Sequence, residues 1–202
     1  GGEVTPYILI KHGVKTLELT ESCIHLNKSR TKASMDLLFN DILRLGRVFD
    51  KSTQAEALVK SWKKDLAMID KALANNPVKR VFLYDSGEEK PFTAGKFAIP
   101  TAMIEAANGK NIVDDMNTSW GRTSWEIVAS RNPEFLILLD YSEDGSGADG
   151  LLKFLRSHPA MSETDAVKNG HYVALRYAEL TPGPANIRAI KKIALGMYPE
   201  RF

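Results

Sequence analysis

The chain has 202 residues, of which 44% are hydrophobic and 26% charged, a composition typical of a globular domain. Lys and Arg number 27 against 25 Asp and Glu, so the near-neutral balance excludes a strongly basic face for nucleic acid. The single cysteine, Cys23, excludes an intramolecular disulfide framework and a cluster of cysteine metal ligands.

The longest apolar run, Phe135 to Leu139, is much shorter than the roughly 18 residues that a membrane-spanning helix needs. No signal peptide is recognisable, and the chain opens on Gly1-Gly2-Glu3 instead of Met. We therefore expect a processed product or a fragment.

The first 33 residues carry few structural signals. A Thr-Pro pair favours a short helix over Thr5–His12, followed by a strand over Val14–Leu19. The polar stretch Thr20–Ala33 predicts a loop. A single strand cannot satisfy its own backbone, so it either joins the downstream sheet or belongs to a sheet encoded upstream of Gly1. We favour the second interpretation.

Two amphipathic helices follow. Apolar residues three or four apart form one stripe between Met35 and Phe49, and a second stripe runs from Leu58 to Leu73. At 1.5 Å per residue, the second helix is expected to span about 22 residues, or roughly 33 Å. That length is sufficient to connect two lobes.

From Val78 onward, strand and helix patterns alternate. Strands are predicted at Arg80–Tyr84, Asn111–Val113, Phe135–Leu139 and Tyr172–Leu175. Helices are predicted at Ala98–Ala107, Ser124–Ser130, Gly150–Ser157 and Pro184–Tyr198. Such alternation with short connections predicts an α/β fold, a Rossmann-like parallel sheet with helices on both faces.

The usual signatures of an enzyme are missing. The sequence has no Gly-rich phosphate loop, no HExxH and no GxSxG, and its four histidines lack metal-ligand spacing. Cys23 and His25 alternate along an extended segment and would point in opposite directions, which argues against a nucleophile pair. We therefore predict no catalytic residue, no cofactor and no metal site, and expect that the protein is not an enzyme.

Polar and aromatic residues gather after the predicted strands. In open parallel sheets, ligands bind beyond the carboxyl ends of the strands. Aromatic rings beside arginines suit a planar or anionic ligand, although loops are polar in any case and aromatic residues also anchor them. The candidate ligand-binding residues are Tyr84, Trp120, Arg122, Tyr141, Arg176 and Tyr177.

Glu126 stands in the first turn of a predicted helix. The segment from Thr123 to Glu126 fits a capping box in which Thr123 is the N-cap and Glu126 reaches back to its N–H. A glutamate in this position could instead be a surface charge that docks a partner. The spacing alone leaves both roles open.

Several segments follow a familiar pattern in their order and spacing: Val78–Tyr84, Pro91–Lys96, Asn111–Val113 with Ser124–Glu126, and Asp165–Val173 with Pro182–Pro184. Together they resemble the C-terminal lobe of ABC-transporter solute-binding proteins, of the class that carries ferric siderophores, haem and cobalamin. The likeness runs from about Thr5 to the C-terminus.

This resemblance implies two α/β lobes joined by a long helix, with the ligand in the cleft between them. Residues 1–33 would be a remnant of the N-terminal lobe, most of which would be missing. Residues 34–77 would include the inter-lobe helix, and residues 78–202 would form the C-terminal α/β lobe. The resemblance also implies that Glu21 contacts the ligand from the other lobe and that Glu126 docks against arginines of the permease.

The resemblance therefore implies an extracytoplasmic binding protein, periplasmic or membrane-anchored as a lipoprotein. Its expected partners are an iron–siderophore or related metal chelate and the ABC permease in the membrane, with no nucleic acid. Cobalamin or haem is the alternative cargo, and a sensor or interaction module that reuses the fold is the alternative function. Pro91–Lys96 is more similar to cobalamin-binding members, whereas Thr20–Cys23 is more similar to siderophore-type relatives.

Overall fold

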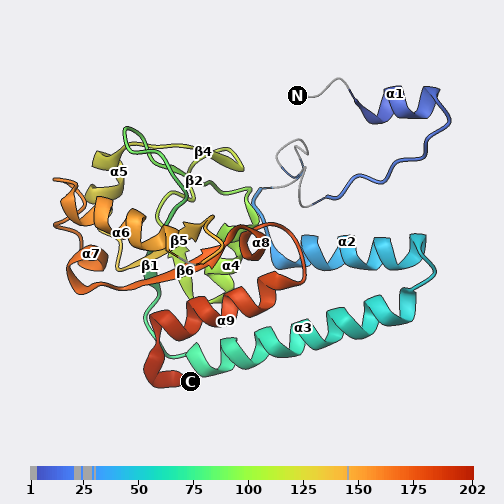
Figure 1. The fold of residues 1–202 in the computed structure, drawn as a ribbon. Helices are drawn as coiled ribbons and strands as arrows, with labels where there is room; N and C mark the ends of the chain where they lie inside the picture. The colour runs from blue at the N-terminus through green and yellow to red at the C-terminus, as the bar shows by residue number, and fades with distance from the viewer. Residues whose placement is uncertain (1–3, 21–23, 25–28, 30, 145) are drawn as a thin grey trace.

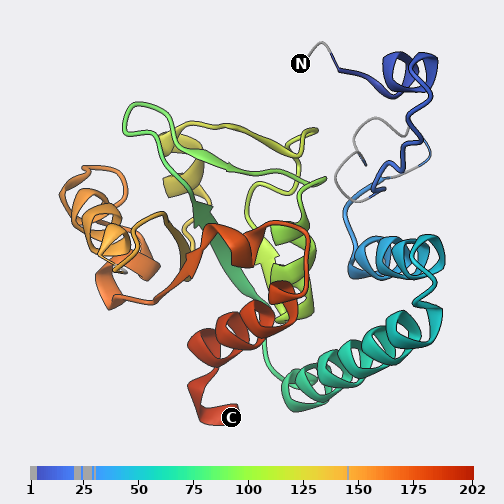
Figure 2. The ribbon, with the colours of Figure 1, turned by 45° about the vertical axis from the view of Figure 1, so that its right-hand side comes forward.

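The computed structural model describes residues 4–20, 24, 29, 31–144 and 146–202. Two packed helices precede the α/β body: α2 (Met35–Val48) and α3 (Ser52–Leu73). They lie side by side in both views (Figures 1 and 2). A Cβ on Gly46 would lie only 2.5 Å from that of Ala55, so glycine permits this close approach. The 22 residues of α3 confirm the predicted length.

Four parallel strands form the central sheet in the order β3-β1-β5-β6. Their bounds are β1 (Lys79–Tyr84), β3 (Gly109–Asn111), β5 (Phe135–Asp140) and β6 (Tyr172–Arg176). The α/β class and the parallel sheet are therefore as predicted. The strand expected at Asn111–Val113 lies earlier, because the Asn111 side chain accepts a hydrogen bond from the Val113 N–H and turns the chain.

Helices cover both faces of the sheet. Val81 and Ile137 contribute to the core beneath α3, α4 (Ile99–Ala106) and α9 (Ala185–Met197). Phe82 and Leu136 contribute to the opposite core, beneath α5 (Trp125–Ser130), α6 (Gly147–Ser157) and α7 (Asp165–Asn169). Alternate side chains of one strand thus enter different cores, which explains the continuous apolar runs in the sequence.

Three short helices and a two-stranded ribbon complete the described elements. The remaining helices are α1 (Pro6–Lys11), α8 (Tyr177–Leu180) and the 3-10 helix η2 (Pro199–Arg201). The ribbon pairs β2 (Phe92–Ala94) with β4 (Trp120–Arg122) in antiparallel fashion. Sequence periodicity missed α7, α8 and the ribbon because segments of three to five residues show no measurable period.

The strand predicted at Val14–Leu19 is wrong. These residues have no regular secondary structure and do not join the downstream sheet. No strand among the described residues pairs with them, so their backbone N–H and C=O groups do not form the hydrogen bonds of a sheet there. The helix α1 before them buries none of its residues, and both views place it apart from the body (Figures 1 and 2).

Candidate functional site

A cleft of about 510 Å³ opens at the carboxyl ends of β1, β5 and β6, beside the ribbon. The ribbon, the ends of the sheet strands and the connection from β2 to α4 contribute its most informative side chains: Asp85, Phe92, Phe97, Trp120, Tyr141 and Tyr177. Ligands of open parallel sheets bind at this end of the strands. Position and lining together make this cleft the candidate binding site.

Two pairs of stacked rings border the cleft. Phe92 and Trp120 on the ribbon have ring centroids 5.8 Å apart and planes inclined by 22°. Tyr141 after β5 and Tyr177 after β6 have centroids 5.8 Å apart and planes inclined by 28°. Tyr141 and Tyr177 are 61% and 57% exposed. Flat aromatic surface left open to solvent is typical of a ligand-binding wall.

A buried carboxylate lies at the base of this aromatic wall. Asp85, directly after β1, is only 6% exposed. The Tyr141 hydroxyl donates to its Oδ2 at 2.8 Å, and the Ser86 hydroxyl donates to its Oδ1 at 2.6 Å. Burial and the hydrogen bond to Asp85 raise the pKa of Tyr141 well above its ordinary value. Tyr141 therefore remains a protonated phenol that orients toward Asp85.

Buried hydrogen bonds hold the ribbon in place. Asn111 at the end of β3 donates from Nδ2 to the carbonyl of Ala94 and to the hydroxyl of Thr101, both at 2.8 Å. The Thr101 hydroxyl donates onward to the carbonyl of Gly95 at 2.7 Å. A Cβ on Gly95 would lie 2.5 Å from the carbonyl oxygen of Thr118, so this crossing requires glycine. The ribbon is thus tied to the sheet and to α4.

The structure brings together three of the predicted ligand-binding residues, because Trp120, Tyr141 and Tyr177 all line the cleft. The placement expected for Tyr84 is wrong. Tyr84 is 1% exposed and packs edge-to-face on Trp125, with ring centroids 5.1 Å apart. Its burial, with nearby acidic groups, raises its pKa to about 12. Tyr84 points into the core because successive strand residues face opposite sides.

The two predicted arginines lie beside the cleft but do not line it. Arg122 donates to the carbonyl of Lys90 at 2.8 Å, and its guanidinium carbon lies 5.6 Å from the ring centroid of Phe92. Arg176 donates to the carbonyl of Glu143 at 2.8 Å.

Glu21 lies outside the described residues, and so do Cys23 and His25. Sequence reasoning missed Asp85, Phe92 and Phe97 as lining residues. The position of Asp85 directly after β1 was the available signal for that residue.

Glu126 lies on the exposed side of α5. The predicted capping box is wrong, because Ser124 is the N-cap and its hydroxyl accepts from the N–H of Ile127 at 3.3 Å. The helix begins one residue later than the capping box requires, which removes Thr123 from the cap. Hydrogen bonds from its own N–H and from the Ser124 hydroxyl lower the pKa of Glu126. Glu126 is therefore an exposed negative charge in a first helical turn.

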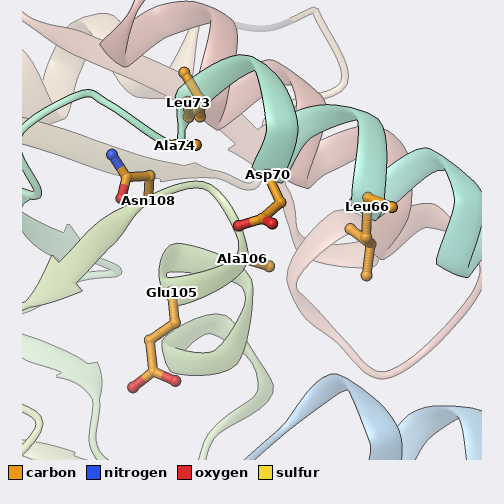
Figure 3. A pocket seen from close by; sticks show the side chains of 8 residues that line it. Leu66, Asp70, Leu73, Ala74, Glu105, Ala106 and Asn108 are labelled. Atoms are coloured by element: carbon orange, nitrogen blue, oxygen red, sulfur yellow. The ribbon is translucent and has the colours of Figure 1, made fainter.

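A second hollow, of about 350 Å³, lies between α3 and α4 (Figure 3). Asp70 on α3 points toward α4, whereas the Glu105 side chain on α4 points away from α3 (Figure 3). Glu105 is already paired with Lys32, with 2.8 Å between Nζ and Oε2. This hollow borders Asn108, just before β3 begins, and therefore lies at the amino end of the sheet. The aromatic cleft, at the carboxyl ends of the strands, is therefore the better candidate for a binding site.

A parallel α/β lobe with an open aromatic cleft at the carboxyl ends of its strands has the architecture of a ligand-binding lobe. Residues 4–178 match the sequence model of the periplasmic binding protein family, so the chain belongs to that family. None of the described helices has the length and apolar character of a membrane span.

A curated relative is the uncharacterized ABC transporter substrate-binding lipoprotein YvrC of Bacillus subtilis. It is 27% identical over 173 residues, which cover 84% of this chain and 52% of the relative. The chain thus spans about half the length of that relative.

Two solved structures share the fold. A periplasmic binding protein from Veillonella parvula is 28% identical with a TM-score of 0.86, over 96% of this chain and 64% of that chain. An ABC-type Fe3+-hydroxamate transport system from Saccharomonospora viridis is 19% identical with a TM-score of 0.81, over 96% and 66% of the two chains. The second similarity is one of fold alone.

Proposed function

We propose that this chain belongs to an extracytoplasmic solute-binding protein that captures a ferric siderophore and delivers it to the permease of an ABC importer. In this proposal, residues 78–202 form the C-terminal lobe, residues 34–77 include the inter-lobe helix, and residues 1–33 belong to the N-terminal lobe. The protein acts by binding and has no enzymatic step. The observation that carries the proposal is the pair of stacked aromatic walls around the cleft.

The dimensions and surface of the cleft favour a large chelate over a bare ion. A cavity of about 510 Å³ bounded by rings offers dispersion contacts to an organic shell. No group of three or more His, Cys, Asp or Glu side chains in the described residues could hold a metal ion directly.

The exposed rings of Tyr141 and Tyr177 are consistent with a cleft that a second lobe completes. The helix α3, unbroken over 22 residues, would join the lobes and restrict their relative motion to a modest hinge. Glu126 would supply the negative charge of this lobe for docking to arginines of the permease. The location proposed is extracytoplasmic, with anchoring as a lipoprotein in the manner of the Bacillus subtilis relative.

Native mass spectrometry of the complete mature protein tests the proposal. The protein would be mixed with ferric siderophores, haem and cobalamin at equal concentration, and one ferric siderophore retained per chain is the expected result. Trp120→Ala serves as the control with a damaged cleft and should retain less of that adduct than wild type. Retention of haem or cobalamin would overturn the siderophore assignment, and the absence of any adduct would overturn the binding function.

The sensor alternative needs a separate measurement. If the protein delivers cargo, vesicles containing its permease should bind the loaded wild-type protein and should not bind Glu126→Arg. Equal binding of both proteins would show that Glu126 is not the docking charge, and no binding of either would favour a sensor without a transporter.

A further inference from the structure

The charge of the aromatic cleft bears on which metal complexes it can receive. Asp85 is the only charged side chain among the described residues that line it. The remaining lining residues are aromatic, aliphatic or hydroxyl-bearing. The described lining therefore offers a negative charge to the cargo and no positive charge to offset it.

The neighbouring cations are engaged elsewhere. Arg122 and Arg176 donate to the carbonyls of Lys90 and Glu143. Lys96 lies over the ring of Phe97, with Nζ 5.0 Å from the ring centroid. Within the described part of the chain, no ion pair joins any of these three cations to Asp85.

Within the part of the chain that the structure describes, the hydrogen-bond donors to Asp85 are all neutral. The hydroxyls of Tyr141 and Ser86 each occupy one of its oxygens, while the side chain is 6% exposed. A buried carboxylate with hydroxyl partners alone is incompletely compensated, since burial of a charge is costly unless an opposite charge pairs with it. A cargo cation or N–H donor entering between Tyr141 and the ribbon would supply that compensation.

A cargo that presents a carboxylate to this cleft meets the opposite situation. It would place a second negative charge near Asp85 in a space walled by rings, where Coulomb interactions are weakly screened. Unfavourable pairing of this kind rejects competitors without a steric clash. Discrimination by charge would then operate among chelates that fit the same aromatic walls.

Resting on the proposed function, we propose that Asp85 determines cargo specificity by charge, favouring cationic or neutral ferric chelates over anionic ones. Tyr141 acts as a positioning residue, because its hydroxyl holds the carboxylate at the base of the cleft. The preference is measured as the ratio of the affinities for cationic and anionic cargo. Contributions of the other lobe to this ratio are the same in every variant, so they cancel when variants are compared.

A series of ligands that share one ferric hydroxamate core and carry different charges on the pendant arm tests this inference. Ferrioxamine B carries a free ammonium and one positive charge, its N-acetyl derivative is neutral, and its N-succinyl derivative carries one negative charge. Their dissociation constants for the complete mature protein would be measured by isothermal titration calorimetry. We expect the cationic member to bind about tenfold or more tightly than the anionic one.

Asp85→Asn removes the charge and keeps one of the two acceptor oxygens, with an amide NH2 in place of the other. It should reduce this ratio by about tenfold. Tyr141→Phe should weaken the whole series and retain the ratio, because the carboxylate remains. Glu89→Gln, an exposed acid in the turn before the ribbon, changes the net charge equally and should leave every affinity unchanged.

Haemin and its dimethyl ester provide a second pair that does not depend on siderophore binding. The hydroxamates could fail to bind while the wild-type protein binds the ester more tightly than haemin and Asp85→Asn binds the two with equal affinity. In that case the siderophore proposal fails and the charge inference holds. Hydroxamates that bind with the same ratio in wild type and Asp85→Asn overturn the inference and leave the siderophore proposal intact. Binding of none of these compounds overturns both.

Discussion

Phe92 and Trp120 are diagonal neighbours across the ribbon, with ring centroids 5.8 Å apart. The register pairs Phe92 with Arg122 and Ala94 with Trp120, so the two rings meet from positions that are not directly opposite. Diagonal pairs on one ribbon face are within reach of large aromatic side chains. The result is a continuous flat wall built from two strands of three residues each.

Removal of the Trp120 ring should weaken cargo binding. Trp120→Ala deletes the indole face that borders the cleft and leaves Phe92 without its stacked partner. We expect the dissociation constant for the bound chelate to rise about tenfold, measured by calorimetry on the complete protein. Phe49→Ala removes an exposed aromatic ring at the end of α2 and should not change it. Equal affinities for wild type and Trp120→Ala would remove Trp120 from the site.

Charge reversal at Glu126 should separate docking from capture. Glu126 is exposed in the first turn of α5, outside the cleft lining, so Glu126→Arg should bind cargo normally. Delivery should fall at least about tenfold, measured as cargo-stimulated ATP hydrolysis by the reconstituted transporter, because like charges would then face the permease arginines. Asp149→Arg reverses a matching acid in the first turn of α6 and should retain delivery. A loss in both variants would indicate a general electrostatic effect instead of a specific contact.

The Asn111 side chain should contribute strongly to stability. Asn111→Ala removes both donors that tie β3 to Ala94 and Thr101 and leaves the buried carbonyl of Ala94 without its side-chain partner. We expect the free energy of unfolding in urea to fall by about 1–3 kcal/mol. Asn169→Ala breaks an exposed side-chain bond to the carbonyl of Asp165 and should cost less than about 0.5 kcal/mol. Similar losses in the two variants would show that burial of the Asn111 network is unimportant.

Glu179 connects β6 to α9 and gives the fold a pH dependence. Burial alone would raise the pKa of its carboxyl, but hydrogen bonds from Lys192 (2.5 Å) and from the N–H of Arg176 (3.0 Å) outweigh that effect and lower it. The folded pKa is therefore below the unfolded value near 4.5. The resulting stabilisation is complete above the unfolded pKa and is lost as the pH falls through the folded pKa.

Glu179→Gln should accordingly lower the free energy of unfolding by about 0.5–1 kcal/mol at pH 7. The difference from wild type should shrink between about pH 5 and pH 3, measured by urea denaturation at each pH. Glu163→Gln breaks an exposed pair with Lys168 and should stay within about 0.5 kcal/mol of wild type throughout. A Glu179→Gln difference that is constant over this range would contradict the assigned hydrogen bonds.

The sequence was sufficient for the sheet and the long helices because these elements carry strong local signals. The buried strands are apolar on both faces, and α3 shows its stripe over 22 residues. The ribbon lacked such a signal, since three-residue strands owe their existence to tertiary bonds such as that between Asn111 and Ala94. The opposite holds for Val14–Leu19, whose sequence pattern is typical of a strand but which pairs with no strand among the described residues.

The same distinction applies to the site. The rule that ligands bind beyond the carboxyl ends of parallel strands located Trp120, Tyr141 and Tyr177, because this rule depends only on topology. It failed for Tyr84 because the rule does not say which of two successive residues faces the cleft. The partners of Arg122 and Arg176 are backbone carbonyls distant in sequence, which no spacing rule anticipates.

The wall formed by Phe92 and Trp120 is tied to the sheet through side-chain hydrogen bonds, and its two rings differ in their relation to the cores. Trp120 packs against the core beneath α3, α4 and α9, whereas Phe92 belongs to neither core. Selectivity and folding therefore depend on the same residue at Trp120 and on separate residues at Phe92. Exchange of the side chain at position 92 between relatives, with the Asn111 tie retained, would alter the recognition surface while the scaffold stays constant. Divergence of cargo within such a lineage would then require few substitutions, at positions other than Trp120 and Ala94, which contact the core.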